Sequence, residues 1–355
     1  MSGEARGAGA ALLRAMLCAA EPFYAASAAA RNWTFDAGLR DSHRVPRPVI
    51  SVGNLTTGGT GKTPVVRWLA QRLRDAGRHV AVIARGYGAR RGEPGDEQVM
   101  LSRLLNDGTS NPVSVLANPD RVTAAQTLLH DRPEVDAIIL DDGFQHRRLA
   151  RDLDIVLLNA ANPFGYDHVL PRGMLREPPR GIARAGAIIL THSDQASGDQ
   201  LNAIENRINR YNTTAPVYRA VHALSSVRVA DDSSPRPVDD LRGRAWFAVT
   251  GIADPQSFLA QLRSTAGRYA GHRAFPDHHP YTGADLAAVR REAEAVNADV
   301  IVTTEKDWAK LQALNVARTG SLPIWRVDVT IQFPGDSEEQ RLWDQVWRVV
   351  SRHGG

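Results

Sequence analysis

Short apolar runs alternate with segments of helical periodicity through the first half of the chain. Runs of this length predict buried strands, and their alternation with helices predicts βαβ units around a parallel sheet. The runs are residues 48–53, 79–84, 113–116, 135–140, 153–158 and 187–191. Ligands of such a sheet gather at the carboxyl ends of its strands. We therefore expect a site where several loops converge: 53–63, 85–96, 141–148 and 191–194.

A polar stretch at residues 225–242 is predicted to be a connection, because a second set of apolar runs follows it. These runs predict a second, smaller α/β lobe and are residues 245–250, 299–303 and 323–329. We expect three parts: an N-terminal helix within residues 1–45, a core in residues 46–228 and a C-terminal lobe in residues 229–355. A final helix at residues 338–352 could close either the core or the lobe.

The N-terminal segment, residues 8–30, is rich in Ala and Leu but is interrupted by Arg14, Glu21 and Pro22. Its apolar runs are shorter than the ~20 residues needed to span a bilayer. We expect an interfacial helix whose large apolar side chains enter the headgroup boundary while nearby arginines meet anionic lipid. A cleavable signal peptide and a helix packed on its own domain are the alternatives.

The composition is that of an ordinary globular protein, with 355 residues, 43% hydrophobic and 23% charged. A net charge of +4 and a pI near 9.4 suit an anionic partner such as phosphate or phospholipid headgroups. Nucleic acid is not expected, because the basic residues are dispersed and no aromatic-plus-basic platform is present. The single cysteine, Cys18, excludes an internal disulfide and any multi-cysteine metal site, as is typical of a cytoplasmic protein.

A glycine-rich loop with Lys-Thr at its end stands between the first predicted strand and a predicted helix at residues 64–73. Strand, glycine loop and helix in this order wrap backbone N–H groups around a triphosphate, with the helix dipole behind them. Lys62 would reach the β- and γ-phosphates of ATP, and the Thr63 hydroxyl would bind Mg²⁺. The predicted ATP-binding residues are Thr56, Thr57, Gly58, Gly59, Thr60, Gly61, Lys62 and Thr63.

The loop departs from the usual P-loop pattern at Thr56, where a glycine is expected. A glycine-rich turn with a chance Lys-Thr is the alternative interpretation. The strand and helix on either side favour the P-loop. The predicted fold is therefore α/β, with a P-loop NTPase-like, mostly parallel sheet core, a second smaller α/β lobe and an N-terminal interfacial helix.

Two carboxylates, Asp141 and Asp142, follow another apolar run and predict the Mg²⁺ side of the nucleotide site. Gln145 and His146 come next, with arginines beside them; this loop could read a substrate or clamp a phosphate, or be a surface basic cluster. In the second lobe, His278 lies beside an aspartate and could accept a proton near neutral pH. A metal site there is the alternative, although no third ligand at helical spacing accompanies the histidine pair.

Seven motifs in order carry a family resemblance: residues 52–64, 85–88, 95–97, 141–146, 170–177, 277–278 and 304–307. Together they resemble the tetraacyldisaccharide 4′-kinases, the lipid A pathway kinases of Gram-negative bacteria. The resemblance extends from the N-terminal helix to at least Lys310. The chain departs from the family pattern at Gln98, Arg172 and Met174. The last two lie in the segment expected to recognise the sugar.

The resemblance implies γ-phosphoryl transfer from ATP to the 4′-hydroxyl of a tetraacylated glucosamine disaccharide 1-phosphate. It further implies a peripheral enzyme on the cytoplasmic face of the inner membrane. Asp96 with His278 would activate the hydroxyl, and Lys62 would neutralise γ-phosphate charge. Since His278 falls in the predicted second lobe, lobe closure would have to assemble the site. The residues expected at the lipid substrate are Arg85, Tyr87, Gln145, His146, Arg172 and Arg176.

A membrane-associated nucleotide-switch ATPase is the competing hypothesis, because such proteins share the Gly-Gly-x-Gly-Lys-Thr loop. They carry a signature lysine immediately before the paired glycines, where this chain has Thr57. Transfer of labelled phosphate to a lipid acceptor separates the two hypotheses.

Overall fold

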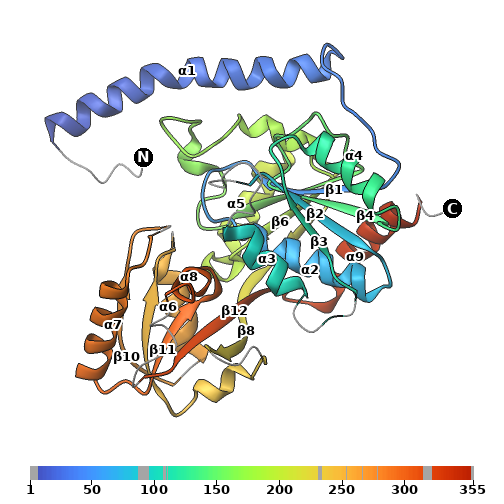
Figure 1. Cartoon of the computed structure of the whole chain (residues 1–355). Coiled ribbons are helices and arrows are strands. Elements are labelled where there is room, and N and C mark those ends of the chain that lie inside the picture. Colours follow the sequence, from blue (N-terminus) through green and yellow to red (C-terminus); the bar gives the residue numbers. More distant parts are fainter. Residues whose placement is uncertain are drawn as a thin grey trace. The chain divides into compact units, whose positions relative to one another are not determined.

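The computed structural model describes residues 7–86, 96–106, 109, 111–230, 234–252, 254–265, 267–277, 279–314 and 322–352. The chain divides into two compact units (Figure 1). Unit 1 takes the described residues within 1–87, 110–221 and 331–355, and unit 2 takes those within 88–109 and 222–330. Each unit is built around its own sheet.

Unit 1 is organised around a seven-stranded sheet in the order β3-β2-β4-β1-β5-β6-β7, and each neighbouring pair is parallel. The strands are β1 Val49–Asn54, β2 Val80–Ala84, β3 Ser114–Ala117, β4 Ala137–Asp141, β5 Leu153–Asn159, β6 Ala187–Thr191 and β7 Val217–Arg219. The helices of unit 1 are α1 Ala8–Asp36, α2 Lys62–Asp75, α4 Arg121–Asp131, α5 Gly198–Asn209 and α9 Asp336–Ser351. The parallel order brings the carboxyl ends of β1, β4 and β5 to one edge, where the phosphate-binding loop begins.

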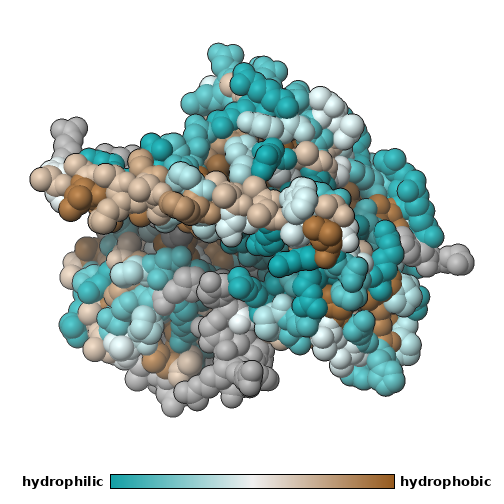
Figure 2. Space-filling view, turned by 90° about the horizontal axis from the view of Figure 1, so that it is seen from above, coloured by the Kyte–Doolittle hydropathy of each residue, from teal (hydrophilic) through white to brown (hydrophobic). Residues whose placement is uncertain are grey.

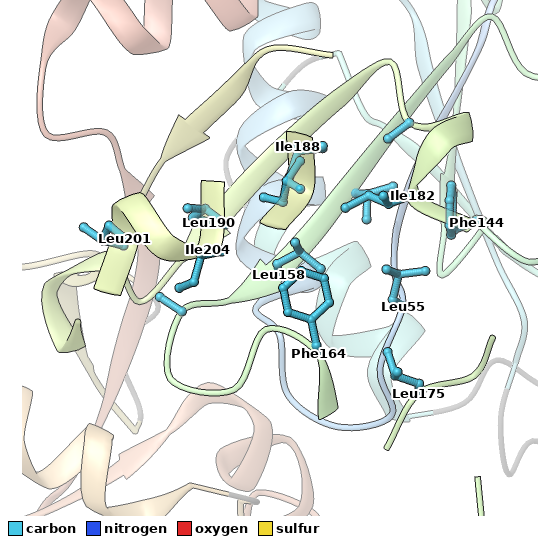
Figure 3. Packing of buried hydrophobic residues seen from close by; sticks show 14 of the residues in the cluster. Leu55, Phe144, Leu158, Phe164, Leu175, Ile182, Ile188, Leu190, Leu201 and Ile204 are labelled. Atoms are coloured by element: carbon cyan, nitrogen blue, oxygen red, sulfur yellow. The ribbon is translucent and has the colours of Figure 1, made fainter. Parts of the chain in front are cut away.

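Two apolar clusters hold α4 and α5 on the sheet of unit 1. Helix α4 packs on β1, β2 and β4, through residues such as Val122 and Leu128 against Ile83 and Ile138. The second cluster joins α5 to β5 and β6 and extends to Leu55 at the start of the phosphate-binding loop (Figure 3). Burial of these side chains therefore stabilises the strand ends that carry the loop.

Unit 2 contains a five-stranded sheet in the order β10-β9-β11-β12-β8. Its strands are β8 Val221–Val229, β9 Ala245–Thr250, β10 Arg268–Ala274, β11 Val300–Thr304 and β12 Ile324–Gln332, and its helices are α3 Asp96–Asn106, α6 Pro255–Thr265, α7 Gly283–Ala295 and α8 Glu305–Leu311. Along β9 the side chains alternate between two cores: Phe247 and Val249 pack with α7 and α8, whereas Trp246 and Ala248 pack with α6. Helix α3 contacts α8.

The architecture confirms the predicted α/β class and the mostly parallel sheet. The division into units differs from the predicted boundaries in two segments: residues 88–109, placed in the core from sequence, group with unit 2, and residues 331–355 group with unit 1. One expectation was wrong. Residues 225–229 are not a connection but the end of β8, where Ser226 Oγ donates to Asp328 Oδ2 at 2.9 Å. Pairing with a buried carboxylate makes this polar strand possible.

Candidate active site

The phosphate-binding loop lies between β1 and α2, as the sequence predicts, and two side chains anchor it at Thr60. Asn54 Nδ2 donates to Thr60 Oγ1 at 2.9 Å, and Thr191 Oγ1 donates to the carbonyl O of Thr60 at 3.0 Å. Gly61 adopts a left-handed conformation, with φ 76°, directly before α2. A glycine supplies this conformation without steric cost, so the loop turns sharply into the helix and directs its N-terminal N–H groups back toward the loop.

A second segment, residues 174–176, pairs with the start of this loop. Thr56 bridges Leu175 in an antiparallel manner, and the backbone N–H of Thr57 donates to the carbonyl O of Met174 at 2.7 Å. The backbone N–H of Arg176 donates to the carbonyl O of Leu55 at 2.7 Å. Thr56 thus has strand-like pairing and is not among the residues with positive φ. This explains how threonine can stand where the usual pattern has glycine.

Lys62 lies in an ionic cluster with the second aspartate. Its Nζ is 3.4 Å from Asp142 Oδ1, and Arg176 Nη1 donates to both carboxylate oxygens at 2.8 and 2.7 Å. Burial alone would raise the pKa of Asp142, but the Lys62 and Arg176 cations lower it below its ordinary value. Asp142 is therefore ionised and balances two cations at the point where phosphates are expected. The sequence predicted Asp142 as a metal residue and Arg176 as a substrate residue; it did not predict their contact.

Asp141 ends β4 and lies opposite Val52 in the neighbouring strand β1. Its carbonyl O accepts a hydrogen bond from Arg121 Nη2 at 3.3 Å. Thr63 stands in the first turn of α2. A hydroxyl and a carboxylate are hard oxygen ligands of the kind that suits Mg²⁺. The described residues contain no group of three or more His, Cys, Asp or Glu that could hold a metal.

The loop after Asp142 carries Gln145 and His146, both predicted at the substrate. Gln145 Nε2 donates to the carbonyl O of Asn54 and to Glu177 Oε1, each at 2.9 Å, so its amide supports the end of β1. Burial and the nearby cations, with Arg121 foremost, lower the pKa of His146 to about 4. His146 is therefore neutral at physiological pH.

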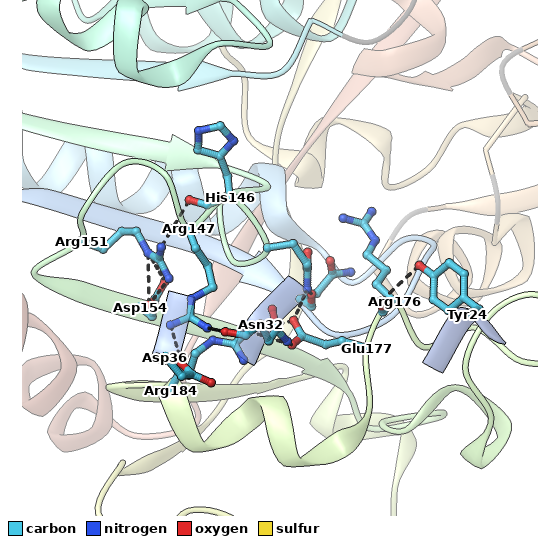
Figure 4. A network of polar contacts seen from close by, with 12 residues as sticks. Tyr24, Asn32, Asp36, His146, Arg147, Arg151, Asp154, Arg176, Glu177 and Arg184 are labelled. Carbon is cyan, nitrogen blue, oxygen red and sulfur yellow. Dashed lines mark hydrogen bonds and ion pairs between the residues drawn. The ribbon is translucent and has the colours of Figure 1, made fainter. Parts of the chain in front are cut away.

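Glu177 is the buried centre of a polar network (Figure 4). Glu177 belongs to the motif at residues 170–177, but the sequence did not predict this network. Its carboxylate accepts from Arg184 Nη2 at 2.9 Å on both oxygens, from Gln145, and from Asn32 Nδ2 at 2.7 Å. Asn32 belongs to α1, so the N-terminal helix reaches this network directly. Nothing in local sequence pattern relates residues so far apart in the chain.

Helix α1 has two distinct faces. The inner face contacts unit 1 at residues spaced three and four apart: Glu21, Tyr24, Ala28, Asn32 and Asp36. On the outer face, Leu12, Met16 and Phe23 are 64%, 55% and 79% exposed. Figure 2, seen from above, shows apolar residues along the exposed side of this helix. The inner-face contacts confirm that the helix packs on its own domain, whereas binding of the exposed face to a membrane stays a prediction.

Two of the remaining predicted substrate residues, Arg172 and Arg85, lie in the described part of unit 1. Arg172 Nη1 donates to Glu21 Oε2 on α1 at 3.1 Å. Arg85 is exposed just after β2, and Tyr87 lies outside the described residues. In the described part of the chain, no helix is long and apolar enough to cross a membrane.

Of the predicted proton-accepting pair, the structure describes only the backbone of Asp96, which opens α3 of unit 2. The side chain of Asp96 and all of His278 lie outside the described part. Next to His278, Asp277 Oδ1 accepts from Lys306 Nζ at 3.0 Å. The residues Thr304–Asp307 are largely structural, because the buried Asp307 accepts from Tyr281 and Thr304 at 3.0 and 2.7 Å. Burial and Asp307 raise the pKa of Tyr281 well above its ordinary value.

Comparison with known proteins now decides the family. A sequence profile described as tetraacyldisaccharide-1-P 4′-kinase matches residues 13–350. The chain belongs to the tetraacyldisaccharide 4′-kinase family. A family member from Anaeromyxobacter sp. (strain K) is 40% identical, with 94% of this chain and 90% of the relative covered. One from Syntrophus aciditrophicus is 38% identical, with 81% and 82% covered.

A solved structure of the same family gives independent agreement. LpxK from Aquifex aeolicus, crystallised in complex with ATP, has 29% identity and a TM-score of 0.71, with 95% of this chain and 99% of that chain covered. The family resemblance inferred from sequence is thus confirmed. Membership makes this protein a phosphotransferase that acts on a hydroxyl group and uses ATP.

Proposed function

We propose that this protein transfers the γ-phosphate of ATP to the 4′-hydroxyl of a tetraacyldisaccharide 1-phosphate in lipid A biosynthesis. The observation that carries this proposal is a phosphate-binding loop with Lys62 in an ionic cluster, inside a chain that matches the 4′-kinase family from residue 13 to residue 350. Phosphoryl transfer depends on positioning and on charge neutralisation more than on covalent chemistry. The cations of the cluster supply the charge neutralisation.

Within unit 1, the chain binds and neutralises the triphosphate. The loop N–H groups and the N-terminus of α2 receive the phosphates, and Lys62 balances charge that develops on the γ-phosphate. Thr63 and Asp141 would hold Mg²⁺, which when bound supplies further neutralisation of the phosphate oxygens. Asp142 is a second candidate ligand, and its carboxylate accepts from Arg176 and contacts Lys62.

Asp96 and His278 are proposed to accept the proton of the 4′-hydroxyl. Asp96 opens α3 of unit 2, whereas the phosphate-binding groups belong to unit 1. Substitution separates these roles. Asp96→Ala and His278→Ala should reduce turnover and leave ATP binding intact, whereas Lys62→Ala should weaken both. Near-normal turnover in the first two variants would show that this pair is not the acceptor.

For the acyl disaccharide we propose Arg85 and His146 as polar contacts, with Tyr87 as a further candidate. Arg85 is exposed and cationic, which suits the 1-phosphate, and His146 is a neutral imidazole. Gln145, Arg172 and Arg176 are predicted substrate residues whose side chains already bond within unit 1. We assign these three residues to support of the site. They would position other residues, and those residues would contact the substrate.

We propose that α1 binds the cytoplasmic face of the inner membrane through its outer face, making the enzyme peripheral. Exposed Leu12, Met16 and Phe23 supply apolar area for the headgroup boundary. Replacing these three by Ser should reduce co-sedimentation with anionic vesicles, while Ser27→Ala on the same helix should not. Substitution is preferable to deletion of the helix, because deletion would also remove the inner-face contacts. Unchanged co-sedimentation of the triple variant would refute the proposal.

The substrate assignment is tested with two acceptor lipids that differ only in the 4′-hydroxyl. Transfer of labelled γ-phosphate in mixed micelles should be detected with the tetraacyldisaccharide 1-phosphate and be absent with its 4′-deoxy analogue. Equal labelling of both acceptors would place the reaction at another hydroxyl.

A further inference from the structure

The inner face of α1 bonds to the two segments that bring charged groups to Lys62. Tyr24 OH donates to the carbonyl O of Arg176 at 3.2 Å, and Asn32 Nδ2 donates to Glu177 Oε2 at 2.7 Å. From the loop that follows Asp142, Arg147 Nη1 donates back to the carbonyl O of Asn32 at 2.9 Å (Figure 4). One helix face therefore holds both the Arg176 segment and the Asp142 loop.

Glu177 extends this contact to the phosphate-binding loop itself. Its fully buried carboxylate accepts from Gln145 Nε2, which also donates to the carbonyl O of Asn54 at the end of β1. Asn54 in turn donates to Thr60 inside the loop. Each of these distances lies between 2.7 and 2.9 Å, so the path from Asn32 to Thr60 consists of well-formed hydrogen bonds.

A buried carboxylate is sensitive to the loss of one donor, because the low local dielectric strengthens each remaining interaction and penalises the missing one. Without Asn32, the Glu177 carboxylate would be free to turn toward Arg184, which already bonds both of its oxygens. Gln145 would then lose a fixed partner, and with it the support of the Asn54 carbonyl. The backbone at the start of the loop would be less firmly placed.

We propose that Asn32 is a positioning residue of the nucleotide site, through which α1 serves as an internal support of the loop that binds ATP. The helix thus has two separate tasks: its outer face is available to lipid, and its inner face fixes Glu177. The proposal rests on the proposed function only in taking ATP as the ligand. It predicts that ATP affinity depends on α1 even when neither membrane nor acceptor is present.

The coupling is reciprocal, because linkage requires that ATP stabilise the docked helix by as much as the docked helix stabilises bound ATP. ATP should therefore slow hydrogen exchange of the α1 backbone in the wild-type protein. A residue that merely holds the fold together would not make exchange in α1 respond to the nucleotide.

The test measures the Kd for ATP by titration calorimetry on the full chain, without lipid or acceptor. Asn32→Asp keeps the size of the side chain but replaces the donated bond with repulsion of Glu177, and Ser27→Ala on the exposed side of α1 is the control. We expect the Kd to rise about tenfold in Asn32→Asp, as for loss of a hydrogen bond to a charged group, and to stay at the wild-type value in the control. Asn32→Asp should also abolish the ATP-dependent protection of α1, while vesicle co-sedimentation stays unchanged.

A Kd within twofold of wild type in Asn32→Asp, or protection of α1 that still responds to ATP, would overturn the proposal. If Asn32→Asp does not fold, Asn32→Ala and Tyr24→Phe decide instead, since each removes one bond without adding a charge. Wild-type affinity in both would overturn it equally. Because the acceptor is absent, failure of the proposed transfer reaction would leave these ATP measurements, and their interpretation, unaffected.

Discussion

His146 gives a quantitative prediction of pH-dependent stability. Burial and the neighbouring Arg121 lower its pKa to about 4 in the folded protein, whereas an unfolded histidine has a pKa near 6.5. As the pH falls from 6.5 toward 4, the unfolded chain takes up a proton that folded His146 does not. The stability contributed by neutral His146 is therefore fully present above the unfolded pKa and is lost as the pH falls toward the folded one. Linkage gives a loss of about 2 kcal/mol at pH 5 relative to pH 8.

Histidine Cε1–H resonances followed by NMR between pH 8 and pH 4 measure this directly. His146→Gln identifies the resonance by its disappearance and keeps a neutral polar side chain at the position. The wild-type resonance should show a midpoint near 4, and hydrogen exchange in β1 and β4 should accelerate more on acidification in wild type than in His146→Gln. Exchange within unit 1 is the suitable measure, because two units need not unfold as one. A midpoint at 6 or above would refute the reasoning.

Two further predictions concern the packing and charge of the same region. Gly53→Ala places a Cβ 2.6 Å from Phe144 Cβ and should destabilise unit 1 by about 1–3 kcal/mol. The control Gly59→Ala places a Cβ with nothing within 4 Å and should leave the stability unchanged. Equal denaturation midpoints for the two variants would contradict this prediction. Arg176→Gln should raise the pKa of Asp142, because burial then opposes Lys62 alone. A lowered carboxylate pKa contributes stability that is lost as the pH falls. The variant should therefore unfold at a higher pH than wild type in an acid titration followed by circular dichroism. Identical acid midpoints would argue against the cluster.

The elements that local pattern controls could be predicted from sequence. The mostly apolar runs before residues 54 and 141 are buried strands, because a parallel sheet is covered on both faces and favours apolar side chains on both. The glycine loop and Lys62 follow the first strand because the turn chemistry is local. Thr56 was the visible departure, and its pairing with Leu175 accounts for it.

Contacts between distant parts of the chain could not be predicted in this way. Asn32 and Glu177 are 145 residues apart, and the charge of Asp142 is balanced by Arg176 from another loop. The membership of α3 in unit 2 is equally non-local, since it depends on packing against α8. Ser226 in β8 was taken for part of a connection because its partner, Asp328, lies on a strand about one hundred residues later.

Sequence and structure group Asp96 differently. Lys62, Thr63 and Asp141 belong to unit 1, whereas α3, which Asp96 opens, belongs to unit 2. Sequence analysis placed Asp96 in the core. The pairing of Asp96 with His278 stays a prediction. Their Ala variants should resemble one another in turnover and in pH profile.

The most direct test of the central claim is the position of phosphate on the product. Wild-type protein and Lys62→Ala would each be incubated with Mg·ATP and tetraacyldisaccharide 1-phosphate in detergent micelles, and the purified lipid would be examined by phosphorus–proton correlation NMR. The account predicts a new phosphorus coupled to the 4′ proton in the wild-type product and none with Lys62→Ala. Release of inorganic phosphate with unmodified lipid, by a protein that binds ATP, would contradict it and support the nucleotide-switch hypothesis.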